Sequence, residues 1–264
     1  MSEMTVFLHE IRSNKVALAI WSGAIAFMIG VCVLIYPEMA PQMAGMTDMF
    51  AEMGSFTDAF GMDQLNFGEF MGYFGIEVGN SLGIGGALFA AIVGANALAK
   101  EEKDRTAEFL LTHPLSRKRI ITEKLMAALA QVCILNAVVI AVTSVCILAV
   151  KVEADAATLA LMFLAYLILQ LEICAITFGI SAFMRGGAIG AGLGIALGMY
   201  FLNIVANLTK ELEFLKFITP FGYADGAHIV PEGSIEIKYL AVGLALSALG
   251  ITAAYLKYTR KDIA

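Results

Sequence analysis

Six apolar runs, each at least 20 residues long, constrain the fold of this chain more than any other feature. They cover residues 16–36, 78–99, 125–150, 157–184, 186–208 and 239–258. A helix of about 20 apolar residues spans the hydrocarbon core of a bilayer. The runs lack the apolar/polar alternation of barrel strands, and only helices or closed barrels satisfy the backbone in lipid. We therefore predict an all-α membrane protein, a single transmembrane domain of six helices over residues 1–264.

The composition agrees with lipid as part of the solvent. Hydrophobic residues make up 59% of the chain and charged residues 15%, and the mean hydropathy is +0.81. A soluble domain usually has about 25% charged residues. A chain this apolar cannot cover itself with polar surface, so the bilayer is its first expected partner.

Lys and Arg are distributed unequally between the two sides that the six spans define. Thirteen lie on the side of the two termini, and four lie on the other side. Cytoplasmic segments carry the excess of Lys and Arg in membrane proteins. We therefore predict a multi-pass protein of the plasma (inner) membrane with both termini in the cytoplasm.

The loop 37–77 then lies outside. It carries seven carboxylates and no Lys or Arg. We interpret it as a solvated acidic loop, and attraction of cations or cationic peptides is the alternative. On the inner side, the segment 2–15 is amphipathic, with Val6, Phe7 and Ile11 opposite charged residues. It is predicted to form an interfacial helix.

Two ladders of small residues recur every four positions. The fifth run contains Gly186, Gly190, Gly194 and Gly198; the second contains Gly75, Gly79 and Gly83, continued by alanines to Ala99. Such stripes allow two helix backbones to approach closely in lipid. Packing within the chain and an interface between subunits both account for the fifth-run ladder.

Polar residues inside the runs are the candidates for a translocation path. Glu172 is a lone carboxylate in the fourth run, and Asn203 and Asn207 lie in the fifth. Intramembrane carboxylates usually face the bundle interior or a water path. Glu172 could equally lie near the inner interface, and buried amides more often pair helices than bind substrate.

The sequence contains no motif for catalysis or for nucleotide or metal binding. The phosphate-binding loop G-x-x-x-x-G-K-[ST] is absent, as are H-E-x-x-H and G-x-S-x-G. The four cysteines lie in apolar runs without a C-x-x-C pair, and the three histidines have no partner at ligand spacing. We therefore expect no catalytic, cofactor or metal site, and no enzyme activity, on this chain.

The most charged segment, residues 100–124, lies between the second and third spans. Glu101–Thr112 is predicted to be a short amphipathic helix with an apolar end at Phe109. The helix should stop before His113, because Pro114 disfavours helical backbone in the residue before it. Ser116 can cap a second helix beginning at Arg117. An ordinary basic cytoplasmic loop would explain the cations, but not an acidic helix with a hydrophobic end.

This segment resembles the signature loop of type 2 ABC exporter permeases. That pattern has an acidic lead, G-T-x-E, two or three apolar residues, x-x-P-[VL]-S-R and a later Lys. The matching residues are Thr106, Glu108, Leu110, Leu111, Pro114, Leu115, Ser116, Arg117 and Lys124. Arg105 stands where the family often has Gly. The motif covers about 25 residues, and the six spans and N-terminal amphipathic segment extend the likeness along the whole chain.

The resemblance implies a permease that works as two membrane subunits on two ABC ATPase subunits. The second membrane subunit would be another copy or a paralogous permease, and ATP and Mg would bind the ATPase. The loop would hold a coupling helix against the ATPase, and residues 208–237 would form a re-entrant outer segment. The implied ATPase-coupling residues are Glu101, Glu102, Arg105, Thr106, Glu108, Phe109, Leu110, Leu111, Pro114, Ser116 and Arg117.

Two other functions stay open. A secondary transporter or channel should show an inverted repeat and several intramembrane charges, and neither is visible. A scaffold or sensor subunit without transport is the third interpretation. The sequence does not identify a substrate, and no nucleic-acid partner is expected.

Overall fold

The computed structural model describes residues 5–44, 54, 57, 59–60, 64–103, 115–184 and 188–260. Within these residues all regular structure is helical, and six helices are long and apolar enough to cross a membrane. The predicted fold class, an all-α protein with six membrane-spanning helices, is confirmed.

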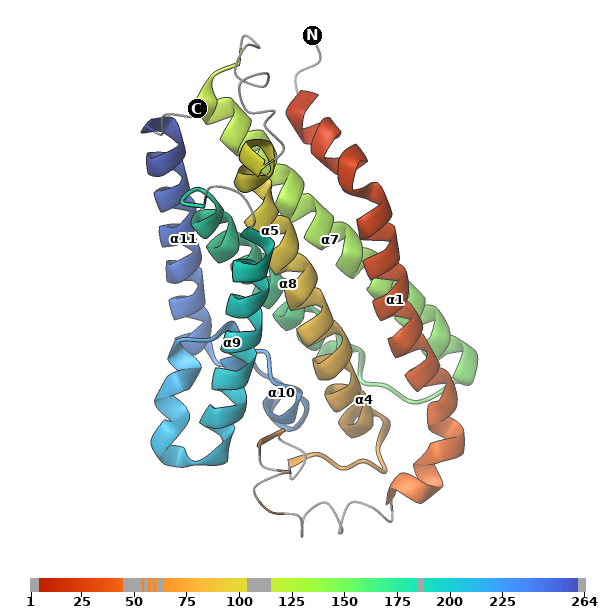
Figure 1. Cartoon of the computed structure of the whole chain (residues 1–264). Helices are drawn as coiled ribbons and strands as arrows, with labels where there is room; N and C mark the ends of the chain where they lie inside the picture. Colours follow the sequence, from red (N-terminus) through yellow and green to blue (C-terminus); the bar gives the residue numbers. More distant parts are fainter. Residues whose placement is uncertain are drawn as a thin grey trace.

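The six helices form one bundle whose two termini lie at the same end, here called the terminal end (Figure 1). The other end is called the distal end. The long helices are α1 (Thr5–Ala44), α4 (Phe70–Val78) with η2 (Gly79–Ile84) and α5 (Gly85–Lys103), α7 (Arg117–Val150), α8 (Ala156–Ser181), α9 (Ala188–Leu208) and α11 (Ile237–Arg260). The distal segment between α9 and α11 contains η3 (Lys210–Phe217), η4 (Pro220–Gly222) and α10 (Gly226–Glu232).

Helix α1 is longer than the first predicted span. It runs without a break from Thr5, inside the segment predicted to lie in the interface, to Ala44, past both Pro37 and Pro41. The prediction that the first span ends at residue 36 and that a loop begins at Pro37 is wrong. The φ of proline is itself helical, so a helix can continue through it at the loss of one backbone hydrogen bond.

The second span is interrupted by a π-helical turn, η2, between α4 and α5. The side-chain amide of Gln170 on α8 donates to the carbonyl oxygen of Leu82 within this turn, at 3.1 Å. The Oε1 atom of Gln170 accepts from Asn136 on α7 at 2.7 Å. These buried amides join three helices, which is the role that intramembrane amides most often have.

Helices α5 and α8 form the centre of the bundle, and small residues bring the other helices close to them. A Cβ added at Gly94 of α5 would meet the carbonyl oxygen of Cys174 on α8 at 2.4 Å. One added at Gly179 of α8 would meet that of Gly250 on α11 at 2.6 Å. By contrast, α7 and α1 expose large apolar side chains, such as Leu148 (76% exposed) and Phe27 (70%). Such surfaces suit contact with lipid rather than water.

The two small-residue ladders face opposite environments. The ladder of the second span is internal: Gly79 lies against the hydroxyl of Tyr166, Gly83 lies against its ring, and Ala91 lies against Gly192 of α9. In α9, nothing among the described residues lies within 4 Å of a Cβ added at Gly190, Gly194 or Gly198. Packing against the described part of the chain therefore does not account for these three glycines. Gly186 lies outside the described residues.

Candidate functional site: an ion cluster and a polar pocket

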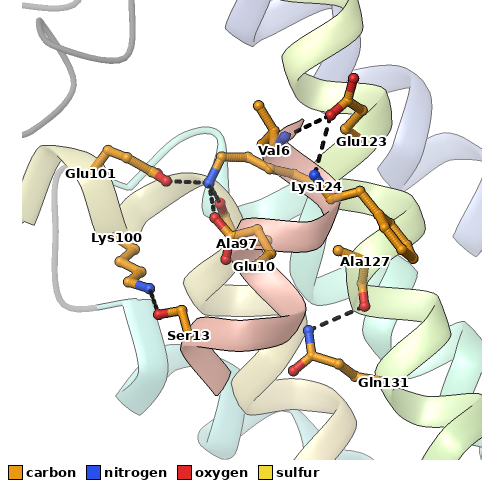
Figure 2. Close-up of polar contacts among 11 residues, drawn as sticks. Val6, Glu10, Ser13, Ala97, Lys100, Glu101, Glu123, Lys124, Ala127 and Gln131 are labelled. Carbon is orange, nitrogen blue, oxygen red and sulfur yellow. Dashed lines mark hydrogen bonds and ion pairs between the residues drawn. The ribbon is translucent and has the colours of Figure 1, made fainter. Parts of the chain in front are cut away.

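A buried lysine joins three helices at the terminal end (Figure 2). Lys124 of α7 is 1% exposed. Its Nζ atom donates to Glu10 of α1 at 2.8 Å, to the carbonyl oxygen of Ala97 on α5 at 2.8 Å, and to Glu101 of α5. We call these four groups the Lys124 cluster. A buried ammonium needs such partners, because an unpaired charge in a low-dielectric interior is strongly disfavoured.

The neighbouring residue on α7, Glu123, binds the first turn of α1. Its Oε2 atom accepts hydrogen bonds from the backbone N–H groups of Val6 (2.8 Å) and Phe7 (3.2 Å), and its Oε1 atom lies 2.7 Å from Nε of Arg119. The first N–H groups of a helix have no partner within the helix and favour a negative charge. Two consecutive residues of α7 thus hold the beginning of α1.

A further contact ties α1 to α5, since Nζ of Lys100 donates to Oγ of Ser13 at 2.8 Å. Helix α5 ends at Lys103 and α7 begins at Arg117. The Lys124 cluster therefore connects the last turns of α5 with the first turns of α7. Because Glu10 belongs to the same cluster, α1 is joined to the ends of both helices.

The predicted coupling residues fall into two groups. Arg105, Thr106, Glu108, Phe109, Leu110, Leu111 and Pro114 lie outside the described residues, as does the side chain of Glu102. The predicted cap of α7 is confirmed: Oγ of Ser116 accepts from the N–H of Arg119 at 3.3 Å. Arg117 reaches the carbonyl oxygen of Tyr258 on α11 at 3.5 Å. Glu101 binds Lys124 through one carboxylate oxygen.

The distal end contains a pocket between α9, the α4–η2 junction, α8 and the start of α10. Asn203 and Asn207 of α9, both predicted from sequence, line this pocket together. Asn80, Tyr166 and Tyr200 supply further polar atoms, and Phe221 supplies an aromatic ring. The structure thus brings two of the three path candidates to one site.

One carboxylate also lines the pocket, that of Asp225, which caps α10 by accepting from the N–H of Ala227 at 3.0 Å. Asn207 contacts it only at 3.5 Å. Burial among protein atoms raises the pKa of the Asp225 carboxyl above its ordinary value, against the lowering effect of the Ala227 hydrogen bond. Asp225 also lines a second pocket, with Lys216 and His228, which we call the outer pocket because it lies next to the exposed η3 helix. The two pockets therefore meet at Asp225.

Glu172 does not line the polar pocket. It is buried inside the bundle, where its Oε2 atom accepts from the hydroxyl of Tyr223 at 2.9 Å. A Cβ added at Gly243 of α11 would meet that oxygen at 2.1 Å. The structure therefore places Glu172 against the distal segment rather than at the inner interface, and its visible role is to hold that segment to α8 and α11.

Sequence reasoning missed Asp225, Tyr223 and the partners of Lys124. Asp225 precedes a glycine in a polar segment and has no motif, and the pairing of Glu10 with Lys124 spans 114 positions. Two features of the sequence pointed to these residues separately. Lys124 matches the family loop, and Glu10 is one of the charged residues of the amphipathic segment 2–15. Neither signal specified a contact between the two residues.

Comparison with known proteins gives one match over nearly the whole chain. The family model described as "ABC-2 family transporter protein" matches residues 4–263. No individual curated protein matches the chain.

Proposed function

Since this chain belongs to the ABC-2 family of transporter proteins, and is thus a membrane transport component without catalytic activity of its own, we propose that it is the permease subunit of an ATP-driven exporter. In this proposal two copies of the chain, or this chain and a paralogous permease, form the translocation path. Two separate ABC ATPase subunits bind at the terminal end and hydrolyse ATP. In this proposal the protein lies in the inner membrane, and its terminal end faces the cytoplasm.

The observation that supports this proposal most directly is the Lys124 cluster. The family loop would contact the ATPase through residues 104–114, which connect α5 with α7. Lys124 and Glu101 join the ends of these two helices, and Glu10 adds α1. A displacement of the loop by the ATPase is therefore passed to three membrane helices at once, as a coupling lever requires.

The proposal predicts the behaviour of the purified chain. Alone, it should hydrolyse no ATP, because its sequence has no phosphate-binding loop. Isolated in mild detergent from its native membrane, it should carry an ABC ATPase at one copy per permease, and the complex should hydrolyse ATP. We would identify the ATPase by mass spectrometry and measure phosphate release from the complex and from the chain alone.

The same preparation separates the alternatives. Transport by the chain alone in vesicles, driven by an ion gradient without ATP, would indicate a secondary transporter or channel. A chain that carries an ATPase in neither its native membrane nor a reconstituted mixture, and transports nothing, would be a scaffold or sensor. Turnover of ATP by the homogeneous chain would contradict the proposal at its base.

The exposed glycines of α9 suggest where two permease subunits meet. Gly190 and Gly194 face away from the rest of the chain, and a stripe of glycines permits close backbone contact in lipid. Replacing both with Leu should lower the dimer fraction in detergent while the monomer still folds. Cross-linking and size-exclusion chromatography would measure this fraction.

Gly192 provides a matched control on the same helix. Its added Cβ would lie 2.7 Å from Cβ of Ala95 and 2.8 Å from the carbonyl oxygen of Ala91. Gly192→Leu should therefore destabilise the folded monomer itself. An unchanged dimer fraction in the Gly190→Leu, Gly194→Leu variant would place the subunit interface elsewhere.

A further inference from the structure

The polar pocket at the distal end contains one acidic side chain and a buried polar atom without a hydrogen-bond partner. Among the residues that line it, Asp225 alone carries a formal charge. Asn203 is 8% exposed, and its Oδ1 atom has no hydrogen-bond partner among the described residues. The hydroxyl of the buried Tyr166 faces the backbone of Gly226. Buried polar atoms without partners cost free energy unless a ligand or water satisfies them.

The unsatisfied atoms are mostly acceptors. A carboxylate and an amide oxygen both accept hydrogen bonds, and a tyrosine hydroxyl can accept as well as donate. Asp225 has one close donor, the N–H of Ala227, and the longer contact with Asn207. The missing partner is therefore a donor. Burial raises the pKa of the Asp225 carboxyl, and a cationic donor beside it would favour the ionised form.

The walls of the pocket distinguish an organic cation from a metal ion. Tyr166, Tyr200 and Phe221 line it with aromatic rings, whose faces attract ammonium groups. Ca²⁺ and Mg²⁺ prefer six or more oxygen ligands, usually from several carboxylates or waters, and this pocket has one carboxylate. Aromatic rings beside one carboxylate suit the head group of an organic ammonium ion.

We propose that the pocket formed by Asn80, Tyr166, Tyr200, Asn203, Phe221 and Asp225 binds the ammonium group of an organic cation. Asp225 neutralises the charge, Asn203 accepts a hydrogen bond and the rings surround the attached carbon atoms. Binding as such requires only this chain. That the cation is the transported substrate rests on the function proposed above, and the pocket would then be its site at the outer end of the path.

The route to the pocket supports a ligand exchanged with the outside. Asn207, Asp225 and Ala227 line both this pocket and the outer one. The outer pocket carries Lys210, Lys216 and His228 as well as Glu213 and Glu236, so its charges of both signs are nearly balanced. Selection for a cation would therefore occur at Asp225 rather than at the entrance.

Charge-selective labelling of a cysteine in the pocket tests the proposal. The four native cysteines, Cys32, Cys133, Cys146 and Cys174, are first replaced with Ala, and folding is verified by size-exclusion chromatography. Asn80→Cys then places a thiol at the pocket, and Glu211→Cys places a reference thiol on the exposed η3 helix. Each purified protein reacts with ethylammonium methanethiosulfonate and, separately, with its anionic ethylsulfonate analogue.

The expected result is a cation-to-anion rate ratio at Asn80→Cys at least tenfold higher than at Glu211→Cys, since a nearby charge in a confined site concentrates its counter-ion. Adding Asp225→Asn, which preserves the helix cap, should bring the two ratios within about threefold. n-Propylammonium should slow labelling at Asn80→Cys, whereas n-propanol should not, and Asn203→Leu should weaken this protection.

Equal ratios at the two cysteines, a preference that survives Asp225→Asn, or equal protection by propanol would each overturn the ammonium site. These measurements use the permease without an ATPase. Their failure therefore leaves the coupling proposal standing. Conversely, absence of an ATPase partner would contradict that proposal and leave an observed cation preference intact.

Discussion

Replacing Phe109 and Leu110 with Asp is expected to release the ATPase from the permease and abolish transport. These residues form the apolar end of the predicted coupling helix, and burying one such side chain contributes roughly 1.5–3 kcal/mol. Losing two such contacts should weaken binding at least about a hundredfold. Retained ATPase would be measured on the tagged permease, and export would be measured in vesicles.

A matched control lies at the other end of the molecule. Phe214→Asp with Leu215→Asp makes the same chemical change in η3 at the distal end, where Phe214 is exposed. This variant should keep the ATPase. Glu108→Ala should lower transport more than assembly, because interfacial charges set register more than affinity. Full retention and full export in the Phe109→Asp, Leu110→Asp variant would show that the ATPase contact is made elsewhere.

Lys124→Met is expected to be the most destabilising single substitution at the terminal end. It would leave Glu10 and Glu101 facing each other in a buried site without a cation. Removing one partner of a buried ion pair typically costs about 3–5 kcal/mol. We would measure the loss as a fall in the unfolding midpoint in detergent. Variants that still fold should also lose coupling between ATP hydrolysis and export.

Two companion variants separate charge from packing. Lys118→Met makes the same change at an exposed position of α7 and should leave stability nearly unaltered. Adding Glu10→Gln and Glu101→Gln to Lys124→Met removes the uncompensated carboxylates and should recover much of the stability, since apolar or neutral replacements of a whole buried ion cluster are often tolerated. A Lys124→Met protein as stable as Lys118→Met would mean that the cluster contributes nothing to the fold.

The part of the coupling region that could be predicted is local in sequence. Ser116 caps α7 because a serine hydroxyl reaches the N–H of a residue three positions on. The contact of Glu101 could not be predicted in the same way. Its place in the family loop predicts an ATPase contact, which stays a prediction. The structure adds a contact with Lys124, 23 positions away and on another helix.

The candidate path residues show the same division. Asn203 and Asn207 share a pocket because they lie four positions apart on one helix, which places them on one face. Glu172 was grouped with them by its chemistry alone. Its actual partner, Tyr223, comes from the distal segment 51 positions later, and Asp225 joins the pocket from that same segment.

The sequence by itself determined the six membrane helices, the family and the segment expected to meet an ATPase, because apolar length, charge and short motifs depend on residues close together in the chain. Only the tertiary structure decided which ladder faces outward, since Gly190 and Gly192 are two positions apart on one helix and face opposite environments. It also decided the partners of Lys124 and Glu172. Those contacts depend on how long helices pack and rotate against one another, and helix packing is set by the whole bundle rather than by any one segment.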